Sequence, residues 1–147
     1  MRRGFTLIEL LIVMGIIGLL TTLGFTNYVT SVKRARDAER KSDLKQIQKA
    51  LELYKLDESP VKYPDTASFP SANTCWTSGG SGATCPAGNV YMRNVPGDGS
   101  VSYSYARDPA DNLKYTLIAC LENPDDPEGT ACASCTSPKL CYTVTEP

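Results

Sequence analysis

The fold of this chain is decided by Phe5-Thr-Leu-Ile-Glu-Leu-Leu-Ile-Val-Met-Gly-Ile-Ile-Gly-Leu-Leu-Thr-Thr-Leu-Gly-Phe25. The stretch holds 21 residues, and Glu9 is its only charged side chain. A helix of that length spans on the order of 30 Å, enough to cross the hydrocarbon core of a bilayer. An unpaired strand could not cross, because lipid leaves its backbone groups without hydrogen-bond partners. The sequence therefore predicts one apolar helix near the N-terminus.

This segment has two ordinary interpretations. A cleaved signal peptide would explain the basic start and the apolar stretch, but Glu9 lies inside that stretch and no A-x-A-like site follows it. A simple membrane anchor is the other interpretation. Arg2 and Arg3 favour a cytoplasmic N-terminus, but the far end is basic as well, so the charge rule alone leaves the orientation open. The basic residues at the far end are Lys33, Arg34 and Arg36.

Helical periodicity continues from Asn27 to Leu56, although the polarity changes. One stripe of the helix is apolar, with spacings of three, four and three, and consists of Leu44, Ile47, Leu51 and Tyr54. No proline or glycine interrupts residues 25–59. We therefore expect one continuous helix from near Phe5 to near Leu56, ended by Asp57-Glu-Ser-Pro60. The stripe should pack on the chain's own sheet, and Asp37 should pair with Lys41 one turn later.

Residues 60–100 are rich in Pro, Gly, Ser, Thr and Asn, which is typical of loops. We expect Ser78-Gly-Gly-Ser-Gly82 to form a flexible tip and Trp76 to pack within its own loop. Three later segments alternate between apolar and polar residues: 100–106, 113–122 and 140–145. Because they are consecutive and joined by turn residues, they predict an antiparallel meander with one face on the amphipathic half of the helix. The fold class is then α+β.

Six cysteines all follow residue 74: Cys75, Cys85, Cys120, Cys132, Cys135 and Cys141. An even number confined to the distal part favours disulfides in an oxidising space outside the cytoplasm. Zinc is the alternative, but the Cys132-x-x-Cys135 pair lacks a second CxxC or a histidine pair. We expect Cys75–Cys85, because its loop is short and rich in turn residues. The other four cysteines allow three pairings, of which Cys120–Cys141 with Cys132–Cys135 is our guess.

Charge and composition exclude several classes of protein. The chain has no histidine, which rules out Ser/His and Cys/His nucleophile systems. Residues 59–147 hold five basic and nine acidic side chains, a net charge of −4 that argues against nucleic acid as a partner. No P-loop, dinucleotide motif or βαβ unit is visible, so Cys132 and Cys135 lack the setting of a thiol oxidoreductase. We predict that the chain is not an enzyme and needs no cofactor.

Glu9 is the residue that a simple anchor does not explain. A carboxylate within a membrane-spanning helix is unfavourable by roughly 2.5–3.5 kcal/mol on insertion scales. The Glu9 carboxylate therefore needs a cation as its partner, but no Lys or Arg lies inside the apolar run. The partner must then come from another molecule, or from a new N-terminal amine made by cleavage.

Gly4-Phe-Thr-Leu-Ile-Glu-Leu-Leu-Ile-Val13 resembles the processing and assembly motif of type IV pilins and type II secretion pseudopilins. A short basic leader, Gly, Phe and then Glu as the fifth residue after the cut make the match specific. The stretch from Arg36 to Asp57 is similar to the stem of pseudopilin-like members, and Tyr63-Pro64 and Asn94–Asp98 resemble their loop region. The last third carries no motif of the family.

The resemblance implies a ladle-shaped α+β fold, in which one long N-terminal helix packs on a small antiparallel head. It divides the chain into a leader, an apolar helix, an amphipathic stem and a β-rich head: residues 1–4, 5–26, 27–56 and 57–147. A prepilin peptidase would cut between Gly4 and Phe5 and methylate the new amine. Glu9 would pair with the Phe5 amine of a neighbouring subunit. Thr26 stands where pilins usually carry a proline.

The resemblance also implies partners and places. These are copies of the chain itself, the peptidase, a membrane platform protein and an assembly ATPase. The chain would lie in the cytoplasmic membrane with its N-terminus inside, and then in an extracellular or periplasmic filament. Some pseudopilins bind calcium in their loops, which makes Asp98, Asp108 and Asp111 weak candidates, although aspartates at turns are ordinary.

Two alternatives stay open. One is a membrane-anchored extracytoplasmic binding domain that never polymerises. The other is a minor pseudopilin of a DNA-uptake or secretion system. The sequence does not separate adhesion, motility, DNA uptake and secretion.

Overall fold

The computed structural model describes residues 4–99, 103–136 and 140–147, and the side chains of residues 23–27 lie outside that description. The predicted leader therefore falls outside it except for Gly4, and so does the first part of the predicted strand 100–106. The elements are α1 (Leu7–Asp57), a 3-10 turn (Thr66–Ser68), β1 (Cys75–Thr77), β2 (Gly80–Gly82), β3 (Val90–Met92), β4 (Ser104–Arg107), β5 (Tyr115–Leu121) and β6 (Leu140–Thr145).

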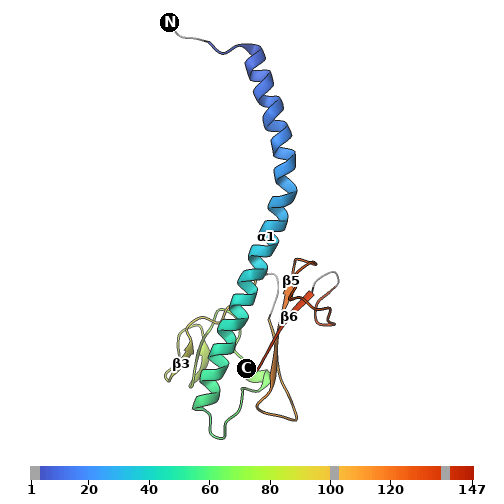
Figure 1. Ribbon diagram of the computed structural model, residues 1–147. Coiled ribbons are helices and arrows are strands. Elements are labelled where there is room, and N and C mark those ends of the chain that lie inside the picture. The colour runs from blue at the N-terminus through green and yellow to red at the C-terminus, as the bar shows by residue number, and fades with distance from the viewer. Residues whose placement is uncertain (1–3, 100–102, 137–139) are drawn as a thin grey trace.

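Helix α1 has 51 residues and is about 76 Å long. Thr6 is its N-cap, and Glu58 adopts an extended conformation at its C-terminal end, two residues before Pro60. The predicted bounds, Phe5 to Leu56, are therefore confirmed to within two residues. The helix runs without interruption through Thr26. Figure 1 shows the N-terminal half of α1 standing clear of the head.

Among the described residues, no other element covers the apolar half of α1. Its large apolar side chains from Phe5 to Leu20 have exposed fractions between 45% and 82%. Within the described residues, no helix has both the length and the apolar character needed to cross a membrane. The predicted apolar segment, residues 5–26, includes residues 23–26, whose side chains are not among those described.

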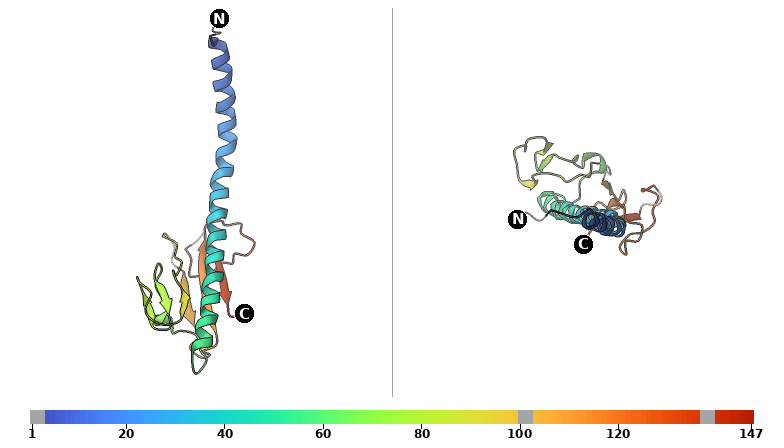
Figure 2. Two further views of the ribbon diagram at one scale, coloured as in Figure 1. Left: turned by 90° about the vertical axis from the view of Figure 1, so that its left-hand side faces the viewer. Right: turned by 90° about the horizontal axis from the view of Figure 1, so that it is seen from above.

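Two small antiparallel sheets pack on the other half of α1. The first has the strand order β2-β1-β3 and the second β4-β5-β6. Figure 1 shows β3 on one side of α1 and β6 on the other. In the view from above in Figure 2, the two sheets lie apart from each other, next to different sides of the helix. The predicted α+β ladle is confirmed.

The second sheet matches the predicted meander. Strand β5 alternates between buried and half-buried residues, with Tyr115, Leu117, Ala119 and Leu121 on the buried face. The first sheet was not predicted, because residues 78–82 were expected to form a tip without regular structure. These residues form the turn and second strand of a β1–β2 hairpin. Strands of three residues are too short to show an alternating pattern, which explains the error.

The core lies between α1 and the two sheets. Leu44, Ile47 and Leu51 are fully buried, so the predicted stripe does face the chain's own head. Trp76 is 4% exposed, as expected of a packing residue, and its ring stacks on Tyr54 with centroids 5.5 Å apart. The remaining buried core residues are Ala50, Tyr63, Tyr91, Val95, Tyr105, Tyr115, Leu117 and Ala119.

The stripe on α1 gives a direct test of this packing. We expect Leu51→Ala to lower the free energy of unfolding by about 2–5 kcal/mol, because it removes a fully buried side chain and leaves a cavity. Leu53→Ala is the matched control: Leu53 is two residues away but 49% exposed, and its change should stay within about 0.5 kcal/mol. Urea unfolding followed by Trp76 fluorescence measures both. Equal effects of the two variants would contradict the observed orientation of α1.

Candidate functional site

The segment before α1 is open to other molecules. Gly4 and Phe5 are exposed and precede the first helical residue, and a side chain at Gly4 would have no atom within 4 Å. Exposed chain outside regular structure is where proteolysis concentrates. The peptide bond between Gly4 and Phe5 is therefore physically accessible to a peptidase. The roles predicted for both residues in cleavage and methylation stay predictions.

Glu9 lies in the first turn of α1 and closes a capping box with Thr6. The Glu9 backbone N–H donates to Thr6 Oγ1 at 3.4 Å, and the Thr6 hydroxyl and backbone N–H donate to Glu9 Oε2 at 3.2 and 3.5 Å. Our sequence analysis missed this motif, although Thr6-Leu-Ile-Glu9 carries its S/T-x-x-E pattern. The carboxylate is thus held at the N-terminal end of the helix, against Thr6.

The capping box gives the Glu9 carboxylate hydrogen bonds but no cationic partner. Its hydrogen bonds come from one hydroxyl and one long backbone contact, and no ion pair to Glu9 forms among the described residues. Near a helix N-terminus a carboxylate gains from the macrodipole, but a full positive charge binds it more strongly. The geometry leaves Glu9 available to a cation from outside the chain.

A second cluster of charges joins the stem to the head. The side chain of Arg40 is only 2% exposed and contacts three carboxylates. Its Nη1 is 2.6 Å from Asp37 Oδ1, its Nη2 is 2.5 Å from Glu122 Oε1, and its Nε donates to Asp98. Arg36 adds an ion pair to the other oxygen of Glu122 at 2.6 Å. Helix α1 is therefore tied both to the segment after β5 and to the segment before β4.

Backbone groups complete this cluster. Asp37, which is buried, accepts hydrogen bonds from the backbone N–H groups of Glu122 at 2.9 Å and Asn123 at 2.8 Å. Burial lowers the pKa of Arg40, but its hydrogen bonds to the three carboxylates outweigh that effect and the pKa is raised. The hydrogen bond from Arg40 lowers the pKa of Glu122, and Arg36 adds to this against the opposing effect of burial. Arg40 and Glu122 therefore stay charged at neutral pH.

The predicted Asp37–Lys41 pair is wrong. Asp37 instead pairs with Arg40, and Lys41 pairs with Asp126 at 2.7 Å and Glu128 at 2.6 Å in the loop after β5. The acids of the head attract Lys41 because they lie against the stem in the folded chain. The stem therefore carries three cations, Arg36, Arg40 and Lys41, that contact carboxylates of the head.

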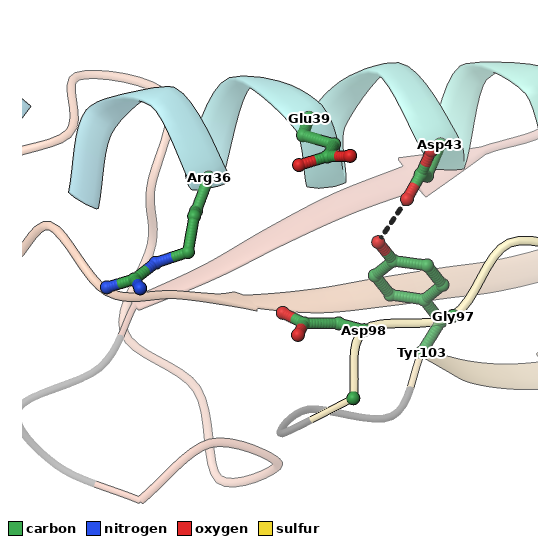
Figure 3. A pocket seen from close by; sticks show the side chains of 7 residues that line it. Arg36, Glu39, Asp43, Gly97, Asp98 and Tyr103 are labelled. Atoms are coloured by element: carbon green, nitrogen blue, oxygen red, sulfur yellow. Dashed lines mark hydrogen bonds between the residues drawn. The ribbon is translucent and has the colours of Figure 1, made fainter. Parts of the chain in front are cut away.

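A shallow depression of about 230 Å³ opens beside the Arg40 cluster. Figure 3 shows Glu39 and Asp43 reaching into it from α1, opposite Asp98 and Tyr103. The Tyr103 hydroxyl donates to Asp43 at 2.6 Å, and Asp98 accepts from Arg40. The carboxylates of Asp43 and Asp98 therefore serve as hydrogen-bond acceptors within the fold. The described residues that line it include no cysteine, serine or threonine.

The three calcium candidates are not brought together. Asp98 belongs to the Arg40 cluster. Asp108 and Asp111 lie in the β4–β5 turn, where each accepts a backbone hydrogen bond from two residues on, Ala110 at 2.8 Å and Leu113 at 2.9 Å. These contacts are those of ordinary turn aspartates. Among the described residues, the group of metal-ligating side chains that does gather consists of Cys120, Cys135 and Cys141.

All six cysteines form disulfides. The predicted Cys75–Cys85 bridge is present. The guess for the other four is wrong, because the bridges are Cys120–Cys135 and Cys132–Cys141. Cys120 and Cys141 do lie opposite each other on β5 and β6, as we assumed. The loop between the strands folds back over both, however, so each of its own cysteines reaches one strand cysteine.

The chain is similar in sequence to known proteins, first of all in its N-terminal segment. Residues 1–25 match the family model described as the prokaryotic N-terminal methylation motif. Over 100 residues, the chain is 34% identical to type II secretion system core protein G of Klebsiella pneumoniae, covering 68% of this chain and 64% of that protein. The chain is a homologue of the type II secretion pseudopilins and the type IV pilins.

Two further relatives show how far the similarity extends. Core protein G of Escherichia coli (strain K12) is 29% identical to this pilin homologue over 135 residues, which is 88% of this chain and 86% of the relative. The type IV major pilin protein PilA of Myxococcus xanthus (strain DK1622) is 36% identical over 66 residues, 45% of this chain and 29% of that protein. The chain spans less than two thirds of the Klebsiella protein. No solved structure matches this chain.

Loss of the Arg40 charge should destabilise the head of this pilin homologue. We expect Arg40→Ala to lower the free energy of unfolding by about 3–5 kcal/mol, because it leaves buried Asp37 without its cation. Arg34→Ala on the exposed face of the same helix is the control, with an expected change within about 0.5 kcal/mol. Chemical unfolding measures both variants, and an unchanged unfolding midpoint for Arg40→Ala would contradict the role given to the cluster.

The cluster should also make stability depend on pH. The pKa of Glu122 is below its ordinary value of 4.5, so its ionised form favours the folded state. That contribution is complete above pH 4.5 and is lost as the pH falls through the lowered pKa. We expect Glu122→Gln to flatten the fall in stability below this pH, whereas Glu39→Gln at an exposed position keeps it. Urea midpoints measured from neutral to acidic pH test this, and parallel curves for wild type and Glu122→Gln would refute it.

Proposed function

We propose that this chain is the structural subunit of a helical, pilus-like filament, a pilin or major-like pseudopilin, and that it does its work by assembly rather than by catalysis. The observation that carries the proposal is the uncovered apolar half of α1 with one carboxylate in its first turn. A leader cut between Gly4 and Phe5 would give the subunit its mature N-terminus.

The exposed apolar surface supports assembly. Side chains from Phe5 to Leu20 present apolar groups all around the helix, and none of them is used by the head. Contiguous apolar surface of this extent marks an interaction with lipid or protein. The membrane would cover it before assembly, and neighbouring copies of the same helix would cover it in the filament. A contact that repeats without closing produces a helical polymer.

Glu9 supports a repeated contact of fixed geometry. Cleavage after Gly4 would create a positively charged amine at Phe5, next to the first turn that holds the carboxylate. In a polymer, the Glu9 carboxylate of one subunit would pair with the Phe5 amine of the next. Such a pair is strongest where water is excluded, as it is between apolar helices. It would set the axial step between subunits, because any other step leaves a buried charge without its partner.

The stem–head junction supports a rigid subunit. The Arg40 cluster and the core around Leu51 fix both sheets on the second half of α1. A step set at Glu9 would therefore be transmitted to the outer surface of the filament. Heads placed by a rigid stem give one regular surface, as a structural subunit requires.

A secretion filament is favoured over a type IV pilus by the extent of the similarity. The core protein G of Escherichia coli aligns with 88% of this chain, whereas the pilin of Myxococcus xanthus aligns with 45%. The homology implies a secretion or pilus assembly system. A prepilin peptidase, a membrane platform protein and an assembly ATPase are the partners that we propose, with the cytoplasmic membrane as the first location and an extracellular or periplasmic filament as the second.

Glu9→Ala tests the proposal against the alternative of an anchored domain that never polymerises. In the native host we expect this variant to enter the membrane and to be cleaved, but to yield at least about tenfold fewer filaments, because an ion pair in an apolar setting contributes more than the 1.4 kcal/mol that corresponds to tenfold. Electron microscopy of sheared filaments and membrane fractionation are the measurements.

Three controls make the result specific. Thr6→Ala breaks the capping box but keeps the carboxylate, and Glu39→Ala removes an exposed carboxylate from the stem; both should assemble. Intact mass should show a mature chain that begins at a methylated Phe5. A normal filament yield from Glu9→Ala would exclude the assembly role, and a native chain that still begins at Met1 would exclude the cleavage.

A further inference from the structure

Four of the six cysteines lie in one cluster at the end of the second sheet. The sulfurs of Cys120, Cys135 and Cys141 are all within 4.8 Å of one another, and Cys132 is bonded to Cys141. They come from β5, from β6 and from the loop that joins these strands. The Cys75–Cys85 bridge belongs to the other sheet. The cluster is a feature of its own, and the proposed filament function does not use it.

Backbone hydrogen bonds place this cluster independently of the bridges. The register of β5 and β6 puts Cys120 directly opposite Cys141. The joining loop is pinned to β6 by a pair of hydrogen bonds: Thr130 N–H donates to the Cys141 carbonyl at 2.9 Å, and Cys141 N–H donates to the Thr130 carbonyl at 2.8 Å. Cys132 follows Thr130 by two residues. The sulfurs would therefore stay together in a chain whose bridges are reduced.

We propose that the reduced forms of Cys120, Cys132, Cys135 and Cys141 make a tetrathiolate site for a zinc ion. The sequence alone argued against zinc, because it has one CxxC pair and no second one. The β5–β6 register supplies the missing pair as Cys120 and Cys141, which face Cys132 and Cys135 of the loop. Two thiolates from a loop CxxC and two from adjacent strands are a complete ligand set for a structural zinc site.

The spacing of the sulfurs suits this ion. Zinc binds thiolate at about 2.3 Å in a tetrahedron, which places two sulfurs about 3.8 Å apart. Cys135 Sγ lies 3.0 Å from Cys141 Sγ, and the sulfurs of Cys120, Cys135 and Cys141 lie within 4.8 Å of one another. These separations bracket the tetrahedral edge, so small side-chain rotations suffice to admit the ion.

Binding would be an exchange of zinc for protons. Four thiols would lose four protons to solvent and form four Zn–S bonds, with no electron transferred. A sulfur in a disulfide carries no thiolate charge, so the zinc site and the two bridges are alternative states of the same residues. Cys135 and Cys141 are buried, which makes the site closed and structural rather than catalytic. Zinc would hold β5, β6 and their loop together before the bridges form.

The test uses the full chain in detergent, reduced without oxygen and titrated with Co²⁺ and then Zn²⁺. We expect one Co²⁺ per chain with the visible absorption of a tetrahedral thiolate complex, and loss of that absorption when Zn²⁺ displaces it. Cys120→Ser and Cys141→Ser should each abolish the absorption. The matched control is the double variant Cys75→Ser/Cys85→Ser, which should keep it in full.

Alkylation of the reduced wild-type chain gives a second measurement that needs no variant to fold. With Zn²⁺, only Cys75 and Cys85 should react, whereas all six cysteines should react once the metal is chelated. Wild-type chain that shows no thiolate absorption with Co²⁺, or whose four clustered cysteines react equally with and without Zn²⁺, would overturn the proposal.

Discussion

Arg40 carries its guanidinium group into the junction between the stem and the head, where the carboxylates of Asp37, Asp98 and Glu122 surround it. A buried ion group of this kind is costly to form and more costly to leave incomplete, because each charge without a partner in the interior is strongly unfavourable. Asp37 lies on α1 itself, whereas Asp98 comes from the segment before β4 and Glu122 from the segment after β5. Their convergence on one side chain fixes how both sheets sit on α1, and the apolar core then fills the space between them.

The same helix serves two environments that do not overlap. Its second half is covered by the head, whereas its first half is exposed and begins with the Thr6–Glu9 capping box. The apolar half needs a partner, and the head is fully built without one. In the proposed filament, this division would separate folding from assembly, because a subunit would complete its head before its first half is covered by neighbouring subunits. A single chain of a pilin homologue is then stable and yet incomplete.

The sequence predicted an element and its buried face where the repeat of apolar residues was long enough to detect. The stripe from Leu44 to Tyr54 and the alternation in β5 both repeat three or more times, and both elements pack on the core as their patterns predict. The first sheet escaped detection because strands of three residues have no period. Lys41 was assigned to Asp37 because local spacing says nothing about acids 85 residues away. The pairing of the last four cysteines depends on the path of a loop, which no pattern fixes, whereas the Thr6–Glu9 capping box was visible in the sequence and was overlooked.

Helix α1 has no break between the head and the apolar half, and this continuity has a mechanical consequence. A load on the head would enter the helix through the Arg40 ion pairs and the core around Leu51. Inside the helix, it would be carried by backbone hydrogen bonds that lie nearly parallel to the pull. The chain has no hinge residue at Thr26 that would bend and absorb part of the load. A filament of such subunits would therefore behave as a bundle of stiff rods whose resistance to tension is set by how firmly each rod is held by its neighbours.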